Sequence, residues 1–167
     1  KSSEGWRLVA ASLCFPSAWN LNEKFGKPLH AIHQPVPGFG KDTRNDGLIG
    51  RMFDNLRPDR PVMRWNWSLY GEAKLYFPAS SNQIKNCFGE GQIAENITLR
   101  IERQTLRKLP KSGDIIFTVR IHLNPLALLE THPDGAALAR AIADQVFAMS
   151  TDELHYKGLT DERERLF

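Results

Sequence analysis

Alternation of apolar and polar residues predicts strands in the middle of the chain. In the segment VMRWNWSLYG, every second residue from Met63 to Leu69 is apolar, which is typical of a half-buried strand. The same period recurs from Ile97 to Ile101 and in residues 115–121. Because only the turn-like LPKSGD separates these last two segments, we expect them to pair as an antiparallel hairpin. A mostly apolar run at residues 7–15, stopped by Pro16, predicts a further, buried strand.

Helical spacing and capping residues predict helices on both sides of these strands. Short helices are expected from Asn20 to Gly26 and from Pro28 to Gln34, and an amphipathic helix at residues 46–56. Residues 35–47 and 78–96 are expected to be loops. Asp134 is expected to cap a helix. Its buried face would consist of Leu138, Ile142, Val146 and Met149. The polar tail from Ser150 has a short helical tendency.

This order of elements predicts an α+β fold in which helices lie against an antiparallel sheet. The 167 residues suit one domain, 1–167, with 41% hydrophobic and 25% charged residues, as in globular proteins. A net charge of +3 does not favour a nucleic-acid partner. No apolar run approaches the roughly 20 residues that span a bilayer. Two cysteines without CxxC or CxxCH spacing predict neither a disulfide framework nor covalent haem, and a cytoplasmic setting is expected.

Arg103 is the residue whose position in the pattern is most unusual. Strand alternation places it on the same face as Ile97 and Ile101. If that face is buried, the arginine points inward, where it needs a partner or a polar ligand. The alternative is that the strand bulges or ends at Ile101 and Arg103 lies at the surface.

Two histidines and two tryptophans are further candidates. His30 and His33 lie three apart on the expected short helix, so they share a face and could ligate a metal, although two unliganded histidines are the more frequent outcome. Trp65 and Trp67 fit sheet packing, or less commonly the wall of a pocket for a flat cofactor. No Walker loop, GxGxxG, GxSxG or HExxH motif occurs.

Five segments in this order resemble one known family, the haem-dependent oxidative N-demethylase-like family. They are WRLVAASLCFPSAW (residues 6–19), GKPLHAIHQPVPG (26–38), RWNWS (64–68), RIERQTLRKLPKSGDIIFTVR (100–120) and YKGL (156–159). The resemblance implies a PAS-like fold that holds haem b. It also implies oxidation of a small, dimethylamine-like secondary amine by O2, with electrons from a partner reductase and release of formaldehyde. Family members carry further sequence before the first segment, which implies an N-terminal part that this chain lacks.

The resemblance also implies roles for particular residues. His33, rather than His30, falls in the family's IHxPVPG pattern and becomes the candidate axial ligand. Arg103 becomes the candidate polar group over the haem, and Glu102 a weaker candidate for binding the substrate ammonium. Candidates for contacting the haem in the remaining motifs are Arg64, Trp67 and Lys157. Two other functions stay open at this point: a haem-containing gas sensor without turnover, and a structural or interaction domain without a cofactor.

Overall fold

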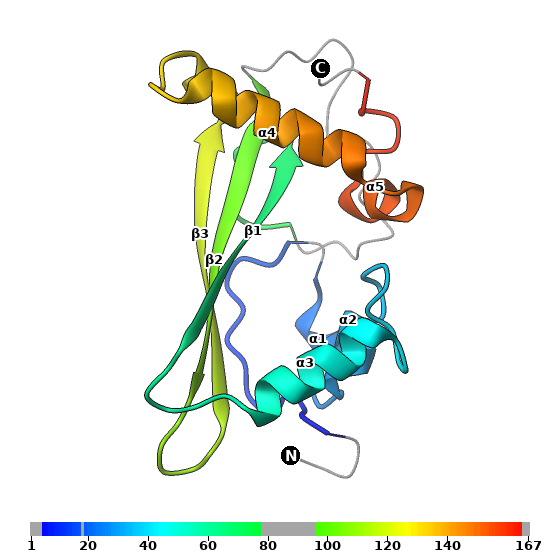
Figure 1. Ribbon diagram of the computed structural model, residues 1–167, viewed down its shortest axis with the longest axis vertical. Helices are drawn as coiled ribbons and strands as arrows, with labels where there is room; N and C mark the ends of the chain where they lie inside the picture. The colour runs from blue at the N-terminus through cyan, green and yellow to red at the C-terminus, as the bar shows by residue number, and fades with distance from the viewer. Residues whose placement is uncertain (1–4, 18, 78–95, 165–167) are drawn as a thin grey trace. The chain divides into compact units, whose positions relative to one another are not determined.

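The computed structural model describes residues 5–17, 19–77 and 96–164 (Figure 1). The elements in chain order are α1 (Leu21–Lys24), α2 (Leu29–His33), α3 (Arg44–Asp54), β1 (Val62–Tyr70), β2 (Thr98–Lys108), β3 (Ile115–Pro125), the 3-10 helix η3 (Leu126–Glu130), α4 (Gly135–Ala148) and α5 (Thr151–Lys157). The loop predicted at residues 78–96 falls almost entirely outside the described residues, so that prediction remains untested.

The three long strands form one antiparallel sheet in the order β1-β2-β3, which confirms the α+β class. The predicted hairpin is also confirmed, because β2 and β3 are neighbours joined by a tight turn. In this turn the backbone N–H of Leu109 donates to Asp114 O at 2.7 Å. Gly113 has a φ of +75° there, a conformation that glycine adopts without strain.

The described residues divide into two compact units. One contains residues up to Cys14, the segment Asn20–Asn66 and the segment Glu102–Ile121; we call it the helix α1–α3 unit. The other contains Phe15–Trp19, Trp67–Ile101 and the chain from His122 onward; we call it the helix α4–α5 unit. Each strand contributes residues to both. The expectation of one domain over residues 1–167 stays a prediction.

The hydrophobic core of the α4–α5 unit lies between the sheet and the two C-terminal helices. Its buried members are Leu69, Ile97, Val146, Leu154 and Leu159, with Trp67, Leu99, Leu126 and Met149 packed against them. The helix α5 begins with a capping box, in which Ser150 and Glu153 satisfy each other's backbone N–H groups. It ends at Gly158, whose φ of +69° is typical of a helix C-terminus. The helical tendency predicted for the tail is therefore confirmed.

The predicted helix after Asp134 is confirmed, but two of its details were wrong. Leu138 is exposed rather than buried, because the helix packs against η3 and the sheet with the face of Val146 and Met149. Asp134 takes the N-cap position, but its side chain makes no capping hydrogen bond. The following residue, Gly135, is buried, and a Cβ atom there would lie 1.7 Å from the backbone oxygen of Leu129.

Side-chain caps also explain the helices of the α1–α3 unit. The Asn20 side chain accepts from the N–H of Asn22 at the start of α1. Thr43 Oγ1 accepts from the N–H of Asp46 at 3.2 Å, so α3 begins at Arg44, two residues before the predicted start. The helix α2 follows Pro28 as predicted. Gly26, with a φ of +74°, separates α1 from α2.

The buried strand predicted at residues 7–15 is wrong. Residues 9–15 are exposed and not part of any strand. Arg7 forms an isolated bridge with Pro28. Leu8 instead bonds to the chain around α1, donating to Lys27 O at 3.1 Å and accepting from Gly26 N at 2.8 Å. An apolar run becomes a strand only where a neighbouring strand satisfies its backbone.

Among the residues that the structure describes, no helix combines the length and the apolar character that crossing a bilayer requires.

Candidate functional site

The strand β2 does not bury the face that its sequence pattern predicts. Arg100 is 1% exposed, and Thr98 and Gln104 on the same face are buried as well. Arg103 points the other way, is exposed, and donates from Nε to Met63 Sδ at 3.1 Å. Of the two alternatives left open for Arg103, the structure shows the surface position, although the strand does not end at Ile101 but continues to Lys108. On this face Leu99 packs against the core of the α4–α5 unit and Ile101 is half-buried, whereas Arg103 is exposed.

His33, the last residue of α2, has a ring orientation fixed by its own helix. Nδ1 lies 3.0 Å from the backbone oxygen of Leu29, one turn earlier. A carbonyl oxygen can only accept, so Nδ1 carries the hydrogen in this bond. In the neutral imidazole, Nε2 is then the unprotonated nitrogen that can accept a proton or ligate a metal. The ring of Phe39 lies near it, with the ring centres 6.3 Å apart.

The surroundings of His33 favour its neutral form. Burial lowers the pKa of His33 from its ordinary value of 6.5, and the positive charges of Arg64 and Lys24 lower it further. The hydrogen bond to Leu29 and the charge of Asp46 act in the opposite direction on this pKa, without reversing the shift. A neutral imidazole with a fixed tautomer is the form that binds metal ions.

A chain of polar side chains runs across β1 and β2 on the face opposite to Arg103. Arg64 donates from Nε to Gln104 Oε1 at 2.6 Å, and Gln104 donates from Nε2 to Glu102 Oε2 at 2.9 Å. Gln104 is buried and Glu102 is half-buried. The positive charge of Arg64 also lowers the pKa of His33.

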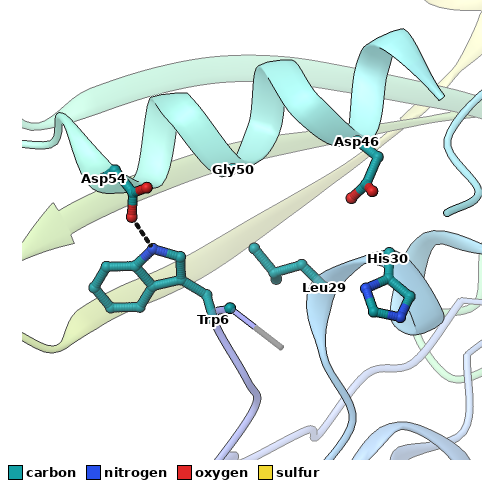
Figure 2. A pocket seen from close by; sticks show the side chains of 7 residues that line it. Trp6, Leu29, His30, Asp46, Gly50 and Asp54 are labelled. Atoms are coloured by element: carbon teal, nitrogen blue, oxygen red, sulfur yellow. Dashed lines mark hydrogen bonds between the residues drawn. The ribbon is translucent and has the colours of Figure 1, made fainter. Parts of the chain in front are cut away.

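His30 lies in a different environment from His33. It lines a pocket of about 110 Å³ between α2 and α3, together with Leu29, Asp46 and Asp54 (Figure 2). Gly5, Trp6 and Gly50 complete the lining. The indole of Trp6 closes one end and donates from Nε1 to Asp54 Oδ1 at 2.8 Å. His33 does not line this pocket. The two histidines therefore lie in different surroundings, although they are only three residues apart.

Trp67 and Lys157 contact each other in the α4–α5 unit. Lys157 donates from Nζ to the backbone oxygen of Trp67 at 2.7 Å, and its charge lies 5.1 Å from the centre of the Trp67 ring. The indole N–H of Trp67 donates to Gln145 Oε1 at 3.0 Å. These contacts explain both residues as part of the packing of the C-terminal helices. Whether either contacts a cofactor stays a prediction.

Sequence reasoning missed several polar residues that the structure buries, among them Arg100, Gln104 and Lys24. Arg100 donates to the backbone oxygens of Phe15 and Leu75, each at 3.1 Å. Gln104 joins the polar chain described above, and Lys24 is buried beside α2. Alternation on β2 places Arg100 and Gln104 on one face with Thr98, but it does not show that this face is buried. Nothing in the sequence marks Lys24, whose burial depends on how α1 packs against α2.

Within the described ranges, no group of three or more His, Cys, Asp or Glu side chains is arranged to hold a metal ion.

Comparison with known proteins gives one match over the whole chain. A protein-family model described as haem-dependent oxidative N-demethylase, alpha subunit-like, matches residues 1–167.

Proposed function

The chain belongs to the haem-dependent oxidative N-demethylase, alpha subunit-like, family, and from this premise we propose that it binds haem b through His33. We further propose that it takes part in the O2-dependent N-demethylation of a small secondary amine, in a PAS-like fold and a cytoplasmic setting. When bound, haem supplies an iron centre that takes electrons from a partner reductase and activates O2.

The observation that carries this proposal is the hydrogen bond from His33 Nδ1 to Leu29 O. Histidines that ligate metals nearly always donate their other ring N–H to a carbonyl or carboxylate, which fixes the ring and raises its basicity. His33 shows this arrangement, and the lowered pKa of His33 keeps the imidazole neutral. Haem fits a single-histidine site, because the porphyrin supplies four of the iron's ligands.

Other residues of the α1–α3 unit would hold the haem and the substrate. Arg64 uses its Nε for the hydrogen bond to Gln104. We assign its terminal guanidinium nitrogens to a haem propionate. Glu102 offers a half-buried carboxylate on the same face of the sheet, which suits a substrate ammonium. Arg103 lies on the opposite, exposed face, so its assignment to the haem pocket rests on the sequence resemblance alone.

The haem spectrum of two matched histidine variants tests this proposal. His33→Ala should lose most of its haem and its Soret band, and added imidazole should restore part of both. His30→Ala, one turn away and lining the pocket between α2 and α3, should keep the wild-type ferric and ferrous spectra. If His30→Ala loses the haem while His33→Ala keeps it, the ligand assignment is wrong. If neither variant changes the spectrum, the iron is held elsewhere.

Turnover separates an enzyme from a haem-containing sensor. With a supplied electron donor, the haem-loaded protein should release formaldehyde in proportion to the secondary amine consumed. Glu102→Gln should retain haem and raise KM for the amine about tenfold, because one charge-assisted hydrogen bond is worth roughly 1.5–3 kcal/mol. A normal spectrum without any amine-dependent formaldehyde would contradict the proposed activity.

A further inference from the structure

Lys24 is a buried cation that the proposed function leaves without a role. It is the last residue of α1 and is only 8% exposed. Its Nζ donates to the backbone oxygen of Ile32 at 3.2 Å. That oxygen belongs to the peptide bond that joins Ile32 to His33. The ammonium group therefore holds the peptide group to which the candidate axial ligand is attached.

A lysine in this position is costly, so its presence needs a reason. Lysine is almost never fully buried unless it is paired. Burial lowers the pKa of Lys24, the neighbouring charge of Lys27 lowers it further, and Glu23 acts in the opposite direction. A neutral donor or a water molecule would satisfy the same carbonyl at lower cost. The positive charge itself is thus the feature to be explained.

One reason for a cation at position 24 is that α2 is short. A helix of five residues is far too short to be stable without tertiary contacts. Its first N–H, on Leu29, donates to Trp6 O at 3.0 Å, and Lys24 secures the opposite end. A cation at the C-terminus of a helix also interacts favourably with the exposed carbonyl groups.

A second reason for a cation at position 24 is the effect of its charge on the iron ligand. Lys24 Nζ lies 3.2 Å from the oxygen of the peptide group that is joined to His33, and its positive charge lowers the pKa of the His33 imidazole. A positive charge near an iron centre disfavours the ferric state, which carries one more positive charge than the ferrous state. Because Lys24 is buried, solvent screens this effect less than it would at the surface.

We propose that Lys24 is a positioning residue for the iron ligand: its hydrogen bond fixes the Ile32–His33 peptide, and its charge raises the reduction potential of the bound haem. This inference rests on the proposed ligation of haem iron by His33. Lys24 itself touches neither iron nor substrate in this assignment.

The ferric/ferrous potential of the haem-loaded protein tests the charge. Lys24→Met removes the charge at similar side-chain length, and Lys24→Gln removes the charge but keeps a donor for Ile32 O. Both should shift the equilibrium about tenfold toward the ferric state, which is about 59 mV for one electron. Lys27→Met is the matched control, since it removes an exposed charge three residues away and should cause a much smaller shift.

The rate of haem transfer to an excess of apomyoglobin tests the hydrogen bond. Lys24→Met should release haem faster than Lys27→Met, because only the change at Lys24 removes the donor to Ile32 O. A potential in Lys24→Gln equal to that of Lys27→Met would overturn the electrostatic role, even if Lys24→Met does not fold. Equal release rates for the two Lys24 variants and Lys27→Met would overturn the positioning role. If His33→Ala retains its haem, the proposed function fails first.

Discussion

Leu159 offers the sharpest test of the core of the α4–α5 unit. Its side chain is 0% exposed within the cluster formed by the sheet and both C-terminal helices. Replacement by alanine removes three carbon atoms, worth about 0.8 kcal/mol each, or about 2.4 kcal/mol. The cavity left behind adds to this loss, so we expect a total of about 3–4 kcal/mol. The backbone bond from Leu159 N to Leu154 O at 2.8 Å is unaffected by the change.

Leu128→Ala is the matched control, because the same atoms are removed from a side chain that is 52% exposed. Leu128→Ala then loses about half of the transfer free energy and leaves no closed cavity. We therefore expect the free energy of unfolding to fall by about 1 kcal/mol. Urea unfolding monitored by tryptophan fluorescence measures both losses, provided that the m-values agree. Similar losses for the two variants would refute the assignment of Leu159 to the core.

Three further results are expected. Hydrogen bonds from the Ser150 backbone and hydroxyl hold the pKa of Glu153 below its usual 4.5. The ionised Glu153 therefore stabilises the folded protein above pH 4.5, and this contribution is lost as the pH falls through the lowered pKa. Melting temperatures of wild type and Glu153→Gln should therefore converge below pH 4.5, and a constant difference would contradict this. Cys14 is a free, exposed thiol, so the native protein should react with a thiol reagent at once, and the unfolded protein without reductant should show both thiols. Because the chain has no CxxCH, acid–butanone should extract all haem, and pigment left on the protein would disprove non-covalent binding.

The elements of the fold could largely be predicted from the sequence because their signals are local. The helix cap at Asn20 and the alternation from Met63 to Leu69 depend only on nearby residues. The run at residues 7–15 was predicted wrongly, since its conformation depends on whether another strand lies beside it. No local feature of an apolar segment carries that information.

The site was less predictable because it depends on which face of a strand is covered. The period of two identifies β2 as a strand, but it does not say that the face of Arg100 and Gln104 is buried. At the start of β2, the polar Thr98 and Arg100 are buried and the apolar Leu99 on the other face is half-buried. Alternation therefore could not decide on which side Arg103 would lie, and the structure shows it exposed. His33 could be selected over His30 only through the family resemblance, while the bond to Leu29 O that distinguishes them required the structure.

Gly135 has a consequence for how this sequence can vary. Its φ is not in the left-handed region, so its backbone conformation is open to any residue, yet a methyl group would collide with the Leu129 carbonyl. The constraint is one of space alone, and no choice of rotamer relieves it. In a library containing every single substitution, position 135 should tolerate replacement as poorly as a ligand position does, although it contacts no cofactor. Loss of function there would be accompanied by loss of soluble protein, which a ligand variant such as His33→Ala would retain.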